Sequence, residues 1–335
     1  MGNSIQTECQ MLNIKGTARF LKKNNNFIIL THSSPDGDTL GAAYALYYGL
    51  KEIGKVAEVI CPDVIPAKYG FFAARETDHV NINNATVVAV DVADKRLLGS
   101  LEEMFGDKVD LNIDHHISNV KYAKYLLLDS SAAATAEVVF ELLEYMKVNI
   151  NTITAKALYT GIATDTGCFK YANVTAKTHS IAAALYEYDI DAAQINKIMF
   201  DTKSKKLLEL ERMVLDTAEY HFDNKCILLC VTAEMQEKTG CSGPDLEGIA
   251  VISRSVEGVI AGITVKQTDD DEFKISMRTY DPLDASQICS KLGGGGHKNA
   301  AGATVKGSLE QVKKSILEAV GSVMEQTDAG ISSSK

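Results

Sequence analysis

The chain has 335 residues, of which 46% are hydrophobic and 23% charged, and its formal net charge is −10 at pH 7. This length favours two globular domains, and no run approaches the ~18 uninterrupted apolar residues that suggest a membrane span. The acidic balance and the lack of a basic run exclude long nucleic acid as a partner, because gripping many phosphates requires clustered Lys and Arg.

The first two-thirds of the chain alternates short apolar runs with helical patterns. Continuous Val, Ile and Leu runs separated by helices indicate a parallel sheet that is covered on both faces. Strands are predicted at residues 26–34, 56–62, 85–94 and 109–116, and helices at 39–54, 135–146 and 153–167. Ligands of such sheets bind at the carboxyl ends of the strands, so polar residues after three of these strands lie where a site is expected.

The last third of the chain changes to a mixed pattern of strands and helices. Residues 190–222 look helical and charged and join the two parts. Strands are then predicted at 225–232, 256–267 and 272–280, and helices at 283–293 and 308–324. We therefore expect an α/β protein with an N-terminal parallel-sheet domain (1–195), a helical linker (196–222), a smaller α+β domain (223–325) and a flexible tail (326–335).

The seven cysteines are scattered along the chain and form no C-x-x-C pair. This pattern argues against a disulfide framework or a thiolate zinc site, and it predicts a reducing compartment. The N-terminus shows no basic and then apolar secretory signal, and Gln6 stands where N-myristoylation requires Ser or Thr. We expect a cytoplasmic protein that has no membrane partner.

The first candidate site follows the strand at 26–34, in the segment His32-Ser-Ser-Pro-Asp36-Gly-Asp38. Three metal-binding side chains on a turn shaped by Pro and Gly can converge on one divalent ion. The alternative is a polar turn that caps the next helix, with Asp38 as the N-cap. Because all three side chains come directly after a buried strand, we favour a metal site.

Two further strands end in acidic or imidazole side chains. Asp91 lies at the end of an apolar run, where a lone acid is as often a turn residue as a ligand. Asp114-His115-His116 follows another such run. Neighbouring side chains on a strand point to opposite sides, so either one histidine binds metal while the other faces substrate, or the strand breaks and both turn inward. A buried carboxylate such as Asp114 commonly orients a ligand histidine.

Asp165 follows a helix rich in Gly and Ala, where a buried acid is costly unless it is paired or coordinated. The alternative is a C-terminal turn with Gly167 in a left-handed conformation. Nitrogen and oxygen donors without thiolate suit Mn²⁺ or Mg²⁺, and two ions that share a carboxylate would use the whole set. The candidate ligands are His32, Asp36, Asp38, Asp91, His115 and Asp165.

The last third carries one conspicuous motif, four glycines from Gly293 to Gly296 followed by His297. Consecutive glycines let backbone N–H groups approach an anion closely. The run lacks both the Walker and the dinucleotide-binding fingerprints. A flexible linker is the alternative, but the glycines lie between two helical patterns rather than in a Ser-rich stretch. Arg254 and Arg278 are candidate guanidinium partners for a phosphate or a base.

These motifs, in this order, resemble those of the DHH phosphoesterases. By length and domain content the chain is most similar to the bacterial nanoRNases, oligoribonucleases that also dephosphorylate 3′-phosphoadenosine 5′-phosphate (pAp). The residues that carry the resemblance to the family's metal motifs are His32-x-x-Pro-Asp36-Gly-Asp38, Asp91, Asp114-His115-His116 and Asp165. The glycine run with His297, preceded by Lys274-Ile-Ser-Met-Arg278, resembles the DHHA1 accessory domain.

The resemblance implies a role for each residue. One Mn²⁺ would be held by His32, Asp36 and Asp91, and a second by Asp38, Asp91, His115 and Asp165, with Mg²⁺ or Co²⁺ as alternatives. Asp114 would orient the site without binding metal, and His116 would contact the scissile phosphate. The nucleotide end would be bound by Gly294, Gly295, Gly296, His297 and Arg278, with Arg254 as a further candidate.

The function implied is hydrolysis, in a cleft between the two domains, of short oligoribonucleotides to mononucleotides and of pAp to AMP. One alternative is a phosphodiesterase for linear dinucleotides such as pGpG or pApA. Another is a non-catalytic sensor that binds nucleotide through the glycine loop. We expect short RNA, dinucleotides or pAp as substrates, two divalent ions as cofactors and a homodimer as a candidate assembly.

Overall fold

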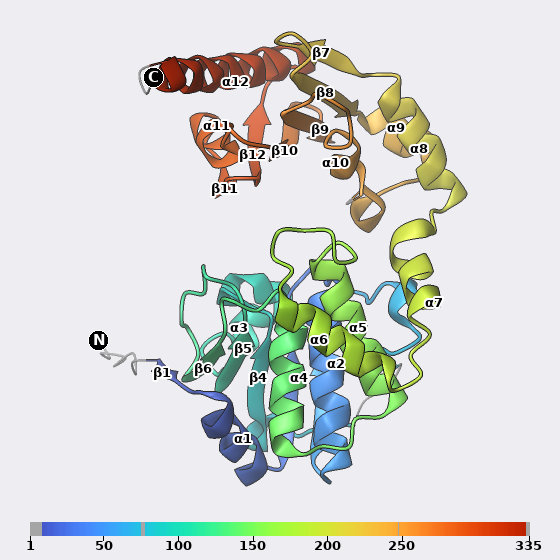
Figure 1. Cartoon of the computed structure of the whole chain (residues 1–335), viewed down its shortest axis with the longest axis vertical. Coiled ribbons are helices and arrows are strands. Elements are labelled where there is room, and N and C mark those ends of the chain that lie inside the picture. The colour runs from blue at the N-terminus through green and yellow to red at the C-terminus, as the bar shows by residue number, and fades with distance from the viewer. Residues whose placement is uncertain (1–8, 75–77, 247, 333–335) are drawn as a thin grey trace. The chain divides into compact units, whose positions relative to one another are not determined.

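The computed structural model describes residues 9–74, 78–246 and 248–332. The chain divides into two compact units, Met1–Thr202 and Lys203–Lys335, which are described separately below (Figure 1). Gln6, which bears on the lipidation prediction, lies outside the described residues. Within those residues, every helix is too short or too polar to span a bilayer.

The first unit is built on a parallel sheet with strand order β1-β6-β5-β4-β2-β3. The predicted strands at 26–34, 56–62, 85–94 and 109–116 are confirmed, although each is shorter than expected. Two short strands, β1 and β6, were not predicted, since so few residues show no pattern. The strands are β1 (Gln10–Met11), β2 (Asn26–Leu30), β3 (Val56–Ile60), β4 (Thr86–Val90), β5 (Leu111–Asp114) and β6 (Tyr125–Leu128).

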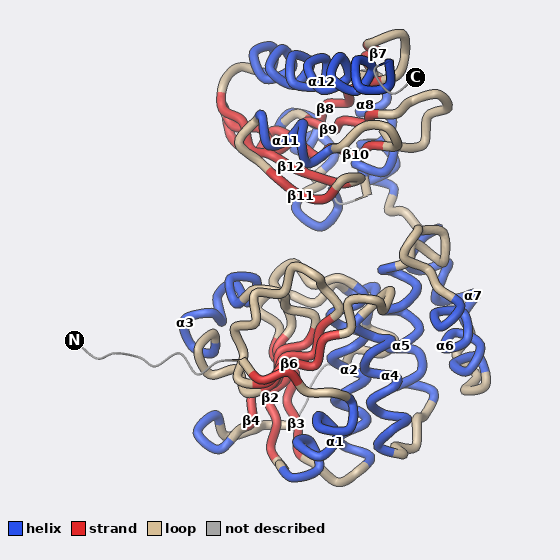
Figure 2. The backbone as a smooth tube through the Cα atoms, turned by 60° about the vertical axis from the view of Figure 1, so that its left-hand side comes forward, coloured by secondary structure: helices blue, strands red, loops and turns tan. Residues whose placement is uncertain are grey.

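Helices cover the two faces of this sheet unequally. Figure 2 shows its strands between α3 on one side and α2, α4 and α5 on the other. The helices are α1 (Ile14–Lys23), α2 (Gly37–Glu52), α3 (Glu102–Phe105), α4 (Thr135–Met146), α5 (Thr152–Asp165), α6 (Ala176–Tyr186) and α7 (Ala192–Asn196). Single 3₁₀ segments lie at Ala67–Tyr69, Ile82–Asn84 and Lys95–Leu101, and a π-helical turn at Lys197–Asp201.

Strand β2 shows why the run at 26–34 is apolar at nearly every position. Phe27 and Ile29 pack into the large core beneath α2, α4 and α5. Ile28 and Leu30 point to the opposite face and pack into a smaller core. A strand buried on both faces therefore needs apolar side chains without alternation, as the sequence predicted.

The second unit contains a mixed sheet with strand order β11-β12-β10-β9-β8-β7, in which β8 and β9 are parallel and the other pairs antiparallel. Its strands are β7 (Glu219–His221), β8 (Cys226–Val231), β9 (Ala261–Asp269), β10 (Glu272–Thr279), β11 (Gly295–His297) and β12 (Ala300–Lys306). Its helices are α8 (Lys205–Leu215), α9 (Ala233–Thr239), α10 (Ile249–Ile252), α11 (Ala285–Lys291) and α12 (Leu309–Ser332), with a 3₁₀ turn at Gly243–Leu246.

Several elements of this unit differ from the sequence prediction. Strand β7 lies inside the stretch 190–222 that looked helical, and α12 continues to Ser332 across most of the expected tail. The predicted strand at 256–267 begins only at Ala261, because residues before it form turns. The glycine run was expected to be a loop, but Gly295–His297 forms an edge strand that pairs with β12. Glycines carry no side-chain periodicity, so this hairpin leaves no hydrophobic pattern.

Candidate metal centre

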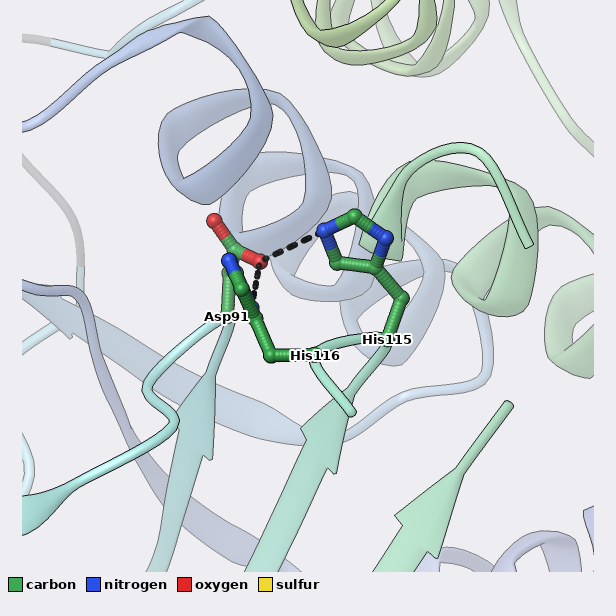
Figure 3. A group of neighbouring side chains, drawn as sticks. All are labelled: Asp91, His115 and His116. Atoms are coloured by element: carbon green, nitrogen blue, oxygen red, sulfur yellow. Dashed lines mark ion pairs between the residues drawn. The ribbon is translucent and has the colours of Figure 1, made fainter. Parts of the chain in front are cut away.

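The backbone turns sharply where β4 ends, at Asp91. This residue has φ 63°, a left-handed conformation that costs free energy in any residue other than Gly and is tolerated best by Asn and Asp. Its N–H still donates to Ile113 O at 2.9 Å, so the ladder between β4 and β5 holds the residue in place. The side chain is buried and lies beside His115 and His116 (Figure 3). The turn thus directs a carboxylate into the carboxyl edge of the sheet.

The segment after β2 brings His32 and Asp36 to the same carboxylate. Nδ1 of His32 donates to Ser33 O at 2.7 Å, so the lone pair of the neutral ring is on Nε2. That Nε2 lies 3.6 Å from Asp36 Oδ1 and 3.7 Å from Asp91 Oδ2. Asp36, not Asp38, is the N-cap of α2, and it accepts from the N–H groups of Asp38 and Thr39. The alternative reading of Asp38 as N-cap was therefore wrong.

Asp38 lies in the first turn of α2 and is 1% exposed. Its two oxygens accept hydrogen bonds from the backbone N–H groups of Thr135, at 2.6 Å, and Ala136, at 2.9 Å. Burial, together with the nearby Asp91 and Asp165, raises the pKa of Asp38 well above its ordinary value. A carboxylate in this position gains free energy from a positive charge beside it.

Both histidines of the Asp-His-His motif turn inward. Strand β5 ends at Asp114, so the alternation of side chains does not continue past it. Nε2 of His115 lies 3.8 Å from Asp91 Oδ1 and 3.5 Å from Asp165 Oδ2. Nδ1 of His116 lies 3.5 Å from Asp91 Oδ1, and dashed lines in Figure 3 join both rings to this carboxylate. The strand thus ends before the histidines and both rings approach Asp91, but His116 stays 41% exposed against 13% for His115, so the structure combines features of the two arrangements left open by the sequence.

Asp114 is fully buried, and its carboxylate contacts the ring of His116. Its Oδ1 accepts from His116 Nδ1 at 2.8 Å, and its Oδ2 accepts from the Asn119 amide at 2.6 Å. Burial alone would raise the pKa of Asp114, but the bonds from His116 and Asn119 outweigh it and lower that pKa. The same hydrogen bond raises the pKa of His116 to about 9. Asp114 thus orients His116, the kind of role the sequence suggested.

Asp165 is the last residue of α5 and faces His115. Burial, together with the negative charges of Asp91 and Asp36, raises the pKa of Asp165 to about 7, although the nearby His115 acts in the opposite direction. The six predicted ligands therefore come together at one edge of the sheet. Ligand atoms lie within 4.8 Å of one another in each of three groups, which are His32–Asp36–Asp91, Asp38–His115–Asp165 and Asp91–His115–His116.

Close contact between α2 and α5 fixes the spacing of these ligands. A Cβ atom added at Gly41 would lie 2.4 Å from Ala157 O, and one added at Gly161 would lie 2.8 Å from Asp38 Oδ1. Distances this short exclude any side chain at either position. The helices therefore meet backbone to backbone, with Asp38 at the start of one and Asp165 at the end of the other.

In the second unit, two of the predicted nucleotide-binding residues, Arg278 and His297, lie in one row of the sheet. Arg278 of β10 and His297 of β11 are both paired with Ala300 of β12. Residues directly opposite each other in antiparallel strands share a face, so both side chains leave the sheet on the same side. Gly262 of β9 is also paired with Arg278, and a Cβ there would lie 2.6 Å from Ser253 O, which places the turn containing Arg254 next to this row.

Two glycines, Gly294 just before β11 and Gly296 within it, are required for the hairpin, whereas Gly295 has open space around it. A Cβ at Gly294 would lie 2.1 Å from Gly302 O, and Gly296 has φ 147°. The residues from Gly295 to His297 are exposed. The run is therefore an exposed edge strand in which backbone N–H groups and His297 lie close to Arg278, rather than a flexible loop.

Sequence reasoning did not identify two polar residues that contact the site. Asn119 bonds to Asp114, and Thr135 bonds to both Asp38 and Asp91. Asn119 lies three positions after His116, within a segment that shows no recognisable pattern. Thr135 begins a helix after a run of small residues, a position at which threonine is ordinary. Only the fold shows what either residue contacts.

Comparison with known proteins gives matches along most of the chain. The family model described as the DHH family, N-terminal domain, matches residues 26–162, and the DHHA1 domain matches residues 224–326. A Thermus thermophilus protein named bifunctional oligoribonuclease and PAP phosphatase NrnA is 35% identical over 300 residues, which cover 87% of this chain and 88% of the relative. A Bacillus subtilis protein of the same name is 24% identical and covers 86% of this chain and 91% of the relative.

The fold also matches a solved structure along nearly its whole length. The crystal structure of an exopolyphosphatase-related protein from Bacteroides fragilis superposes with a TM-score of 0.86 at 24% identity. The match covers 94% of this chain and 97% of that chain. At this identity the likeness concerns the fold alone.

Proposed function

Because the chain belongs to the DHH family and carries a DHHA1 domain, we propose that it is a divalent-metal-dependent phosphoesterase that hydrolyses short oligoribonucleotides to mononucleotides and pAp to AMP. Relatives from Thermus and Bacillus bear names for these two activities. The observation that carries the proposal is the convergence of two imidazoles and four carboxylates at the edge of one sheet, with Asp91 belonging to two of the three groups.

The donor chemistry fits divalent ions. Oxygen and imidazole nitrogen donors without thiolate suit Mn²⁺ or Mg²⁺, and we favour Mn²⁺. The three carboxylates Asp38, Asp91 and Asp165 lie close together with raised pKa values, as expected of groups that await a positive charge. When bound, such ions polarise phosphoryl oxygens and stabilise the charge that develops on them. One ion would be held by the group His32, Asp36 and Asp91, and the other by the group Asp38, His115 and Asp165 together with Asp91, which lies beside His115.

His116 is the residue best placed to serve the phosphate. Its Nδ1 donates to Asp114, which favours the protonated ring and leaves Nε2–H as a donor. The side chain is 41% exposed, far more than the 13% of His115. A cationic donor of this kind stabilises the negative charge of a phosphoryl group in the transition state. Asp114 accepts the hydrogen bond from this ring, and Asn119 in turn donates to Asp114, so the two residues would orient His116.

Residues of the second unit are proposed to bind the nucleotide. Arg278 offers a planar guanidinium that can form two hydrogen bonds to a phosphate. His297 and the backbone of β11 lie in the same row and are exposed. Arg254, in the adjacent turn, is a further candidate. A few local contacts of this kind suit very short substrates, in keeping with the net charge of −10.

We also propose a cytoplasmic location. All seven cysteines are free thiols, and four of them are buried. Free buried thiols are typical of a reducing compartment. A homodimer is one candidate assembly, and sedimentation of the purified protein would measure its mass directly.

The proposal is tested by incubating purified protein with Mn²⁺ and pAp, and in parallel with an RNA ladder from dinucleotides to long oligomers. We expect metal-dependent turnover of pAp and of the shortest RNAs, abolished by EDTA and by Asp91→Asn. Turnover of linear dinucleotides alone would favour the alternative phosphodiesterase. Nucleotide binding without any turnover would replace the proposed enzyme by a sensor.

A further inference from the structure

Thr135 contacts two carboxylates that reach it from different strands and helices. It is the first residue of α4 and is fully buried. Its hydroxyl donates to Asp91 Oδ1 at 2.7 Å, and its backbone N–H donates to Asp38 Oδ2 at 2.6 Å. One residue thereby connects the carboxylate after β4 with the carboxylate at the start of α2.

The start of α4 is itself unusual, because its own N-cap offers no acceptor. Ala134 occupies the cap position, and no side chain of the cap bonds to the helix. The first N–H groups of a helix need acceptors, and a carboxylate at this end gains from the helix dipole. Asp38 supplies both oxygens, to Thr135 N–H and to Ala136 N–H. The backbone N–H of Thr135 therefore positions Asp38, whereas the hydroxyl of Thr135 donates to Asp91.

Asp91 has few other constraints on the rotation of its carboxylate. Its Oδ1 faces His115, His116 and the Thr135 hydroxyl, whereas its Oδ2 faces His32. The distances to the three imidazoles range from 3.5 to 3.8 Å, which are too long for strong hydrogen bonds. The 2.7 Å bond from Thr135 is the short one. It fixes which oxygen faces which histidine.

We infer that Thr135 is a positioning residue that holds the Asp91 carboxylate in the rotation needed to present one oxygen to each half of the metal centre. This inference rests on the proposed function, because it concerns the same ions. A buried hydroxyl costs free energy unless it forms a hydrogen bond, and the Thr135 hydroxyl forms its bond with the Asp91 carboxylate. Ligand orientation by such a contact typically changes metal affinity by about 10- to 100-fold.

The test compares Thr135→Val, which keeps the shape and removes the hydroxyl, with Thr135→Ser, which keeps the hydroxyl. Thr160→Val is the matched control, since Thr160 is also fully buried but its hydroxyl bonds only to the carbonyl of Lys156. Mn²⁺ binding to the full chain is titrated by the electron paramagnetic resonance signal of the free ion. Turnover of pAp is then measured as a function of Mn²⁺ concentration.

We expect Thr135→Val to bind Mn²⁺ about 10- to 100-fold more weakly, with kcat recovering at high Mn²⁺ and KM for pAp unchanged. Thr135→Ser and Thr160→Val should bind Mn²⁺ within about threefold of wild type, well below the 10- to 100-fold loss expected of Thr135→Val. A merely structural role would lower the melting temperature without this recovery. If Thr135→Val does not fold, Thr135→Ala removes the hydroxyl without crowding the site.

Two results would overturn the inference alone. One is wild-type Mn²⁺ affinity in folded Thr135→Val or Thr135→Ala. The other is equal loss of affinity in Thr135→Ser, which would show that the methyl group matters and the hydroxyl does not. Wild-type protein that binds no Mn²⁺ would instead overturn the proposed function, and this inference with it. The wild-type titration therefore separates the two failures.

Discussion

Nδ1 of His116 lies 2.8 Å from Oδ1 of Asp114, a carboxylate that has no exposed surface. A carboxylate only accepts hydrogen bonds when ionised, so Nδ1 carries a proton and the ring orientation is fixed. The pair is charge-assisted, and bonds of this type are about twice as strong as neutral ones. This single contact determines how the exposed edge of the imidazole is presented.

The first prediction follows from that contact. Asp114→Asn keeps the shape but removes the charge, so we expect kcat for pAp to fall about 10- to 100-fold with little change in KM. Steady-state kinetics at saturating Mn²⁺ measure both constants. Asp110→Asn is the control, since Asp110 immediately precedes β5, at the end opposite Asp114, and its carboxylate accepts a hydrogen bond from the backbone N–H of Val87. Equal losses in both variants would contradict a specific role for Asp114.

The left-handed backbone of Asp91 leads to a second prediction, about which substitutions the site tolerates. Asn adopts positive φ readily, whereas Ala does so at a cost of roughly 1 kcal/mol or more. We expect Asp91→Asn to fold with near-native stability yet lose Mn²⁺ binding and turnover. Asp91→Ala should lose both and also be less stable. Chemical denaturation of both variants in EDTA checks this order, and equal stabilities would contradict it.

A third prediction concerns the metal-free protein and pH. Burial raises the pKa of Asp165 to about 7 in the folded chain, against an ordinary value near ~3.9 in the unfolded chain. The folded state then binds the proton more tightly, so stability falls as pH rises from about 4 to about 7. His32 and His116, whose pKa values are raised to about 9, extend this fall to higher pH.

Thermal melts in EDTA test this behaviour. Asp165→Asn removes the ionisable group, so its melting temperature should depend less on pH between about 4 and 7 than that of wild type. Glu52→Gln, an exposed acid at the end of α2, is the control and should leave the slope unchanged. An unaltered slope in Asp165→Asn would show that this carboxyl is not what makes the metal-free protein pH-sensitive.

The fourth prediction addresses the second unit. Arg278→Lys keeps the positive charge but loses the planar fork, and we expect KM for pAp to rise about tenfold, the loss of roughly one good hydrogen bond to a charged group. Mn²⁺ affinity should not change. Lys274→Ala is the control, because Lys274 is exposed on the same strand and the same side of the sheet, four positions away. A larger effect from Lys274 would shift the nucleotide site along β10.

The sequence was sufficient to predict that the six proposed metal ligands lie close together, for a physical reason. His32, Asp91 and Asp114 each interrupt an apolar run, and a parallel sheet brings all such interruptions to one edge. The strand pattern thus placed residues far apart in the chain together. For Asp91 the sequence left ligand and turn evenly balanced, and the structure shows a turn that directs the carboxylate toward the other proposed ligands.

What the sequence could not predict depends on single contacts between distant segments. The bonds from Thr135 span 97 residues to Asp38 and 44 residues to Asp91. The hydrophobic periodicity of a sequence contains no information about hydrogen bonds between residues so far apart. The hairpin at Gly295–His297 escaped prediction for a different reason, since its partner strand and not its side chains defines it. Local patterns predict elements, whereas contacts of this kind need the fold.

The glycine contacts between α2 and α5 have a consequence for how this site can change over generations. Where side chains separate two helices, a substitution at one position can be accommodated because neighbouring side chains repack. Here Gly41 lies against Ala157 and Gly161 against Asp38, so no such buffer exists. Any larger residue would push apart the two ends that carry Asp38 and Asp165. The distance between these two carboxylates therefore depends on glycines that are not themselves proposed ligands.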